Sequence, residues 1–114
     1  MRLLKQIIDQ TNAKIVLSTS WKEIWETVLE ISIQLKDYFT SFNIDVYGVT
    51  KNINYNRPLE ISTWIKEHLV TSYVILDDIK GPWFEHENNI VITNAEFTGL
   101  TEQDVNKAIE ILKK

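Results

Sequence analysis

Three short polar clusters in this sequence hold residue types that suit the binding of a phosphate group and a metal ion. They are Ser18-Thr19-Ser20, Asp77-Asp78 and Thr93-Asn94. Each follows a short run of apolar, mostly β-branched residues, which predicts that each begins where a buried strand ends. In an open parallel sheet, ligands bind beyond the carboxyl ends of the strands. Hydroxyl, carboxylate and amide oxygens gathered at that edge would suit a Mg²⁺-bound phosphate.

Each cluster also has an ordinary structural interpretation. Ser20 is followed three residues later by Glu23, and this pair predicts a capping box, so Ser18 is the better ligand candidate. Serine at a strand end also bonds to nearby amides, and aspartate often starts a turn. The adjacent carboxylates of Asp77 and Asp78 repel one another unless a cation or a hydrogen-bond donor is present. Metal binding and turn formation are therefore equally supported at this pair.

Two further segments carry side chains with alternative interpretations. Arg57 precedes Pro58 at the expected start of a helix, where the helix dipole prefers negative charge, so the arginine either reaches toward a phosphate or lies in solvent. Trp83 and Phe84 follow a Gly-Pro pair, and they either anchor a loop in the core, which is favoured, or form an exposed lip. His86 lies between two glutamates and is expected at the surface.

The hydrophobic pattern predicts alternating helices and strands. Gly48 is expected to end a strand, and Tyr38 and Leu69 are expected on the buried faces of their helices. Short apolar strands that alternate with helices imply an α/β fold with a parallel sheet. The first helix carries Leu3, Leu4, Ile7 and Ile8 and is expected to stop at Asn12. The other helices are expected over residues 20–39, 58–69 and 101–112, with Thr101 as the cap of the last one and Asp104 at its third position. The strands are expected over residues 14–17, 44–47, 73–76 and 90–92.

Length and composition limit the classes of function. The chain of 114 residues is expected to form one domain, residues 1–114. It has no cysteine, which excludes disulfides and zinc-thiolate sites, and its formal charge of -4 argues against a general polyanion binder. The sequence contains no apolar run of membrane-spanning length and no secretory leader, so we expect a cytoplasmic protein with no membrane partner.

The ordered set of motifs resembles the haloacid dehalogenase (HAD)-like phosphatases, and in particular the HAD domains of bacterial RNA-repair proteins. Residues 15–22 are similar to the second motif of that group, residues 57–65 to the third and residues 73–78 to the fourth. Residues 89–101 resemble its usual ending. The resemblance spans nearly the whole chain, and it implies a Rossmann-like three-layer sandwich with a mainly parallel sheet.

The resemblance also implies a role for each candidate site residue. Ser18 would hold the transferring phosphoryl group, and Arg57 would neutralise its charge, with Lys51 as a substitute in the same loop. Asp77 and Asp78 would bind or orient Mg²⁺. The expected substrate is a small phosphorylated molecule or the phosphorylated end of a nucleic acid. These roles are consistent with phosphoryl transfer, which depends on positioning and on stabilisation of charge.

The first motif of the family has no match in this sequence. That motif is a central strand ending in Asp-x-Asp, whose first aspartate is the nucleophile. Asp9 falls on a predicted helix, and Asp45 has no second acid two residues later. We therefore assign no catalytic residue and expect an HAD-like domain that is truncated at its N-terminus and lacks the usual first strand. Unpaired strand edges are costly, so we expect either re-pairing of the remaining strands or a homo-oligomer that borrows a strand.

Three hypotheses of function follow from these observations. The first is the greater part of a Mg²⁺-dependent phosphomonoester phosphatase with weak or no activity in this chain, because the nucleophile is missing. The second is a non-catalytic HAD-fold module for binding or oligomerisation. The third, a generic α/β domain whose motifs arise by chance, is the least favoured.

Overall fold

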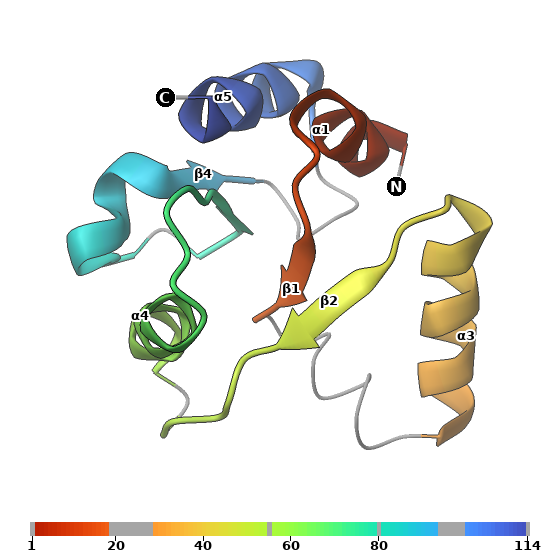
Figure 1. Ribbon diagram of the computed structural model, residues 1–114, viewed down its shortest axis with the longest axis horizontal. Coiled ribbons are helices and arrows are strands. Elements are labelled where there is room, and N and C mark those ends of the chain that lie inside the picture. The colour runs from red at the N-terminus through yellow and green to blue at the C-terminus, as the bar shows by residue number, and fades with distance from the viewer. Residues whose placement is uncertain (1, 19–28, 55, 80, 94–99, 114) are drawn as a thin grey trace. The chain divides into compact units, whose positions relative to one another are not determined.

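The computed structural model describes residues 2–18, 29–54, 56–79, 81–93 and 100–113. Contacts along the chain divide it into two compact units. The first unit comprises Met1–Ala13 and Ile65–Lys114, and the second unit comprises Lys14–Trp64. Each unit contains one two-stranded parallel sheet together with helical segments (Figure 1). The α/β composition and the parallel pairing of the strands confirm the predictions from the hydrophobic pattern.

The sheet of the second unit pairs β1 (Ile15–Leu17) with β2 (Val46–Val49). Leu17 lies opposite Val49 at the carboxyl end of the pair. Helix α3 (Leu29–Ser41) lies between these strands in the chain, and α4 (Arg57–Glu67) begins in this unit.

Strand β2 continues through Gly48, so the prediction that this glycine ends a strand is wrong. The reason is close packing against the indole ring of Trp64. A Cβ atom at position 48 would overlap that ring and lie 2.9 Å from Cζ2. Glycine is therefore required here by a neighbouring side chain and not by a turn.

Helix α3 confirms part of the prediction for residues 20–39. Phe39 is buried, and its carbonyl oxygen accepts a hydrogen bond from the backbone N–H of Ile44 (3.0 Å), which fixes the turn after the helix. Tyr38, in contrast, is exposed, so its expected place on the buried face is wrong. The predicted capping box at Ser20 and Glu23 lies outside the described residues.

The first unit contains α1 (Arg2–Thr11), β3 (Ile75–Asp77), the 3₁₀ helix η1 (Phe84–Asn89), β4 (Ile90–Ile92) and α5 (Glu102–Leu112). Helices α1 and α5 lie side by side (Figure 1). The buried cluster of this unit joins both helices to β4, because aliphatic side chains from all three elements pack together. Its members are Ile7, Val91, Val105 and Ala108.

The ends of the helices follow local side-chain and backbone signals. The Thr101 hydroxyl accepts a hydrogen bond from the backbone N–H of Asp104, whose carboxylate accepts one from the N–H of Thr101, as the capping box predicts. Helix α4 ends at Glu67, and Leu69 follows in a left-handed conformation with φ of 52°. Leu69 is 85% exposed, so its expected burial is wrong: the helix ends before this side chain can turn inward.

The described strands form two separate pairs, β1 with β2 and β3 with β4. Among the described residues, β1 does not pair with β3, so the expected re-pairing of these two strands is not seen. The borrowing of a strand from a second molecule stays a prediction. Within the same parts of the chain, no helix combines the length and the apolar character that crossing a membrane requires.

Candidate functional site

Asp77 is the last residue of β3, and its side chain is completely buried, with 0% exposure. Its Oδ1 accepts a hydrogen bond from the backbone N–H of Ile79 at 3.1 Å. Its main-chain oxygen accepts another from the N–H of Thr93 at 2.8 Å, directly after β4. Thr93 is also buried, whereas Asp78 is exposed. The strand ends therefore bring Asp77 and Thr93 together at one edge, as the parallel arrangement predicts.

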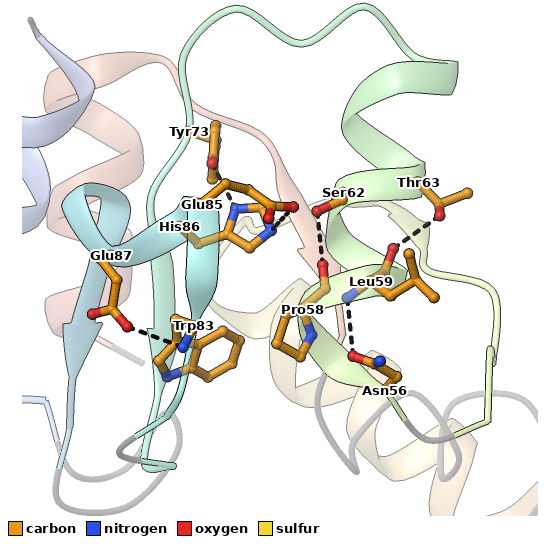
Figure 2. A network of polar contacts seen from close by, with 10 residues as sticks. All are labelled: Asn56, Pro58, Leu59, Ser62, Thr63, Tyr73, Trp83, Glu85, His86 and Glu87. Atoms are coloured by element: carbon orange, nitrogen blue, oxygen red, sulfur yellow. Dashed lines mark hydrogen bonds and ion pairs between the residues drawn. The ribbon is translucent and has the colours of Figure 1, made fainter.

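The loop after β3 is held in place by the buried indole of Trp83. Its Nε1–H donates to the carbonyl oxygen of Ile79 at 2.9 Å, and its backbone N–H donates to Oε1 of Glu87 at 3.1 Å (Figure 2). Trp83 therefore anchors the loop in the core, which is the interpretation that the sequence favoured. The adjacent Phe84, in contrast, is exposed. The two aromatic residues thus have different roles, which the sequence did not distinguish.

His86 is 1% exposed, so the prediction of a surface histidine is wrong. The 3₁₀ helix η1 turns its ring inward, where Nδ1 lies 2.6 Å from the hydroxyl oxygen of Tyr73 (Figure 2). Its Nε2 lies 3.6 Å from Oε1 of the exposed Glu85. A buried imidazole with polar partners on both nitrogens is stabilised in place. No sequence signal pairs residue 73 with residue 86, because a 3₁₀ turn was not predicted there.

Tyr73 belongs to the same polar group. Burial raises the pKa of the Tyr73 phenol above its usual value of 10.0, and the negative charge of Glu85 raises that pKa further. The Tyr73 hydroxyl lies within hydrogen-bonding distance of Nδ1 of His86, and Nε2 of the same ring faces the carboxylate of Glu85. The main-chain oxygen of Tyr73 accepts a hydrogen bond from Asn89 Nδ2 at 2.9 Å, so Tyr73 contacts both His86 and the last residue of η1.

In the second unit, the carbonyl oxygen of Leu17 joins the ends of β1 and β2. It accepts hydrogen bonds from the backbone N–H of Thr50 at 3.0 Å and from the Thr50 hydroxyl at 3.4 Å. Ser18 directly follows Leu17, and Lys51 directly follows Thr50. Both residues therefore lie just beyond the same end of the sheet. Ser18 is half-buried and Lys51 is exposed.

The loop that leads from Lys51 to α4 is fixed by a buried carboxylate. Glu60 is 3% exposed, and its Oε2 accepts a hydrogen bond from the backbone N–H of Ile53 at 2.9 Å. Asn56 bonds to the first turn of α4 through its side chain, which accepts from the N–H of Leu59 at 3.2 Å (Figure 2). The sequence showed Glu60 only as part of a motif; its loop contact was not foreseen.

Arg57 is the first residue of α4, directly after Asn56, and is half-buried. The two cationic candidates, Lys51 and Arg57, therefore lie on either side of Ile53, the residue whose N–H Glu60 binds. Backbone contacts hold the loop at Thr50 and at Asn56, whose N–H donates to the carbonyl oxygen of residue 53 at 2.9 Å.

The side chains at the end of β3 offer oxygen atoms alone, which is the donor type that Mg²⁺ prefers. Mg²⁺ in phosphate-transfer sites is bound through one or two carboxylates together with phosphate oxygens and water. Asp77 and Asp78 fit that set. Within the described part of the chain, no three His, Asp or Glu side chains gather closely enough to hold a metal ion by themselves.

The candidate residues thus fall into two groups. Ser18, Lys51 and Arg57 belong to the second unit, and Asp77 and Asp78 belong to the first. The structure describes each group within its own unit, and the binding roles of all five stay predictions. The other polar members of the clusters, Thr19, Ser20 and Asn94, lie outside the described residues.

A family model described as the HAD domain in Swiss Army Knife RNA repair proteins matches residues 1–105. Neither the curated proteins nor the solved structures gave a match to this sequence. The family match includes residues of both units and confirms the resemblance that the ordered motifs indicated.

Proposed function

Because the chain belongs to the family of HAD domains in Swiss Army Knife RNA repair proteins, we propose that it binds a phosphorylated nucleic-acid end together with Mg²⁺. It is a HAD-type hydrolase domain, and in its intact family form the domain would be a Mg²⁺-dependent phosphomonoester phosphatase with a three-layer sandwich fold. The observation that carries the proposal is Asp77, a fully buried carboxylate at the carboxyl end of a parallel strand. A small phosphorylated molecule is the other substrate class that this site would accept.

On the metal side, Asp77 and Asp78 would hold Mg²⁺. The bound ion would supply positive charge that offsets the charge of the phosphate. The hydrogen bond from Ile79 N–H to Asp77 Oδ1 fixes the orientation of that carboxylate. Burial in a low-dielectric environment strengthens the attraction between a carboxylate and a cation. Asp77 therefore positions the ion, while the exposed Asp78 adds a second carboxylate.

On the phosphate side, the Ser18 hydroxyl would donate a hydrogen bond to a phosphate oxygen. Lys51 or Arg57 would neutralise the remaining charge. The bonds from Thr50 to the carbonyl oxygen of Leu17 and from Ile53 to Glu60 support this role, because they restrict the loop before phosphate binds. A pre-ordered loop loses less conformational entropy on binding.

Turnover by this chain is proposed to be low. No pair of aspartates in its sequence has the Asp-x-Asp spacing, and the covalent step of the family depends on such a pair. The remaining residues bind and orient a phosphate without attacking it. Binding of phosphate, with little hydrolysis, is therefore the measurable activity.

The test is calorimetric titration of the chain with inorganic phosphate in the presence of Mg²⁺. We expect binding that Asp77→Asn and Ser18→Ala each weaken by about tenfold or more, since each loses a charge-assisted contact. Asp37→Asn, which changes an exposed acid on α3, is the matched control and should bind as the wild type does. Hydrolysis of an aryl phosphate should be near background. Absence of phosphate binding by the wild type, or rapid hydrolysis lost in Asp77→Asn, would contradict the proposal.

A second candidate function is a non-catalytic module that assembles with another copy of itself. Its support is that each described sheet has only two strands of three or four residues, and such pairs are marginal by themselves. A strand from a second copy would extend them. Analytical ultracentrifugation over a concentration series tests this: a dimer supports assembly, and a strict monomer at all concentrations contradicts it.

A further inference from the structure

Phe84 combines two features that core packing does not explain. Its side chain is 65% exposed, and its backbone φ is 53°, in the left-handed region. That region is unfavourable for a bulky residue, because the side chain crowds the backbone. A glycine or asparagine would occupy this position at lower cost. Strained positions of this kind persist when the surrounding structure imposes them, and they concentrate at functional sites.

The surroundings of Phe84 do impose its position. The preceding residue, Trp83, is buried and bonded through both of its nitrogens to Ile79 and Glu87. His86, two residues after Phe84, is buried against Tyr73 (Figure 2), and its backbone N–H donates to the carbonyl oxygen of Trp83 at 2.9 Å. The phenyl ring is thus presented to solvent from a segment that is anchored on both sides.

The same contacts connect Phe84 to the candidate metal ligand. Asp77 Oδ1 accepts from the N–H of Ile79, and the carbonyl oxygen of Ile79 accepts from the indole of Trp83. Two consecutive hydrogen bonds therefore join the end of β3 to the residue beside Phe84. Ile79 is itself exposed. The segment that follows Asp77 and Asp78 therefore has two exposed apolar side chains, those of Ile79 and Phe84.

We propose that Phe84 is a stacking platform for a nucleobase of the nucleic-acid end whose phosphate is bound with Mg²⁺ at Asp77. This inference rests on the proposed function and adds a substrate contact to it. Stacking on an aromatic ring needs no particular base, since every base has a π face. It also needs no positive surface, and so it suits a chain with a formal charge of -4.

The charge of the chain leads to a specific expectation for salt dependence. Proteins that bind nucleic acid through many phosphate contacts lose affinity steeply as salt rises, because binding releases counterions. A site with one Mg²⁺-bound phosphate and one stacked base makes few such contacts. Its affinity for an oligonucleotide should therefore change little between low and moderate salt, at constant Mg²⁺.

The test compares two probes on the full chain in the presence of Mg²⁺. One is a short single-stranded oligoribonucleotide with a terminal phosphate, and the other is ribose 5-phosphate, which has no base. Phe84→Ala should weaken oligonucleotide binding roughly 5- to 150-fold, the range for loss of one stacked base, and leave ribose 5-phosphate unaffected. Phe84→Tyr should restore oligonucleotide binding.

Two further variants separate stacking from a structural role. Phe84→Gly relieves the left-handed strain, so it should raise Tm while losing oligonucleotide affinity, whereas a structural role would lower Tm. Leu69→Ala is the matched control, because Leu69 is an exposed apolar residue with φ of 52° and has no ring. It should bind both probes as the wild type does.

The outcomes distinguish this inference from the proposed function. If Phe84→Ala binds the oligonucleotide as tightly as the wild type, the stacking platform is wrong while the phosphate site stands. The same conclusion follows if Leu69→Ala weakens binding equally. If the wild type binds neither probe, the proposed function fails and this inference fails with it.

Discussion

The hydroxyl oxygen of Tyr73 lies 2.6 Å from Nδ1 of His86, and this short contact joins the segment before β3 to the 3₁₀ helix that follows the loop. The two rings meet edge to face, with centroids 5.5 Å apart. The contact fixes His86 in the interior, and His86 in turn bonds to the carbonyl oxygen of Trp83. The loop that carries Phe84 therefore depends on a polar pair whose histidine lies outside every motif of the sequence.

This pair predicts a loss of stability at alkaline pH. Burial first, and then the charge of Glu85, raise the pKa of Tyr73 above 10.0 in the folded chain. The unfolded chain releases the phenolic proton at a lower pH than the folded chain does, so the free energy of unfolding should fall as the pH rises above about 10. The stabilisation is fully present below that pH and is lost as the pH rises through the folded-state pKa.

Urea unfolding between pH 7 and 11 measures this effect with Tyr73→Phe as the comparison. The variant should be less stable by about 1 kcal/mol at pH 7, through loss of the bond to His86. Its stability should fall less steeply than that of the wild type above pH 10. Equal alkaline slopes in the two proteins would show that Tyr73 does not titrate with a raised pKa.

How much of the structure was predictable depends on whether the signal was local. Parallel strands, the capping box at Thr101 and the end of α1 at Asn12 all follow from neighbouring residues, and each was predicted correctly. The position of Gly48 within β2 could not be predicted, because the reason for it is the Trp64 ring, sixteen residues away in the sequence. The burial of His86 likewise depends on a distant tyrosine.

The residues of the candidate site also differ in whether a local signal in the sequence identifies them. Serine and aspartate at strand ends were identified from residue type and spacing, since a strand end is a local feature of the sequence. The contact of Glu60 with the backbone of Ile53 was not identified, because a carboxylate in the first turn of a helix is ordinarily explained by the helix dipole. The sequence did not indicate that Trp83 is buried and Phe84 exposed, because the two are adjacent aromatic residues with the same flanking sequence.

A substitution at Gly48 tests the packing of β2. In Gly48→Ala the new methyl group would overlap the Trp64 ring, so we expect a loss of about 1–3 kcal/mol in the free energy of unfolding, as for other overpacked sites. The double variant Gly48→Ala/Trp64→Leu should be less destabilised than the sum of its single variants, because the smaller side chain relieves the overlap. Urea unfolding measures both. Additive effects, or a Gly48→Ala variant as stable as the wild type, would contradict the packing.

Glu60 provides a prediction about the loop that carries Lys51. Glu60→Ala leaves the part-buried N–H of Ile53 without this acceptor, so the variant should lose about 1 kcal/mol of stability and should bind phosphate more weakly. Glu60→Gln keeps an acceptor oxygen and should retain most of the phosphate affinity. Glu110→Ala, at an exposed position on α5, is the control for loss of a carboxylate.

Thermal unfolding and phosphate titration of these three variants separate the two effects. If Glu60→Gln binds phosphate as weakly as Glu60→Ala does, the charge of Glu60, and not its hydrogen bond to the loop, is what matters. If neither variant changes phosphate affinity, the loop has no part in binding.

The proposed role of Asp77 is to hold Mg²⁺ while the chain binds phosphate. Calorimetric measurement of phosphate affinity with and without Mg²⁺, in the wild type and in Asp77→Asn, tests this role, and Asp37→Asn is the control. We expect Mg²⁺ to tighten phosphate binding about tenfold or more in the wild type and in Asp37→Asn, and we expect Asp77→Asn to abolish this coupling. Phosphate affinity that is independent of Mg²⁺, or Mg²⁺ coupling that survives in Asp77→Asn, would contradict it.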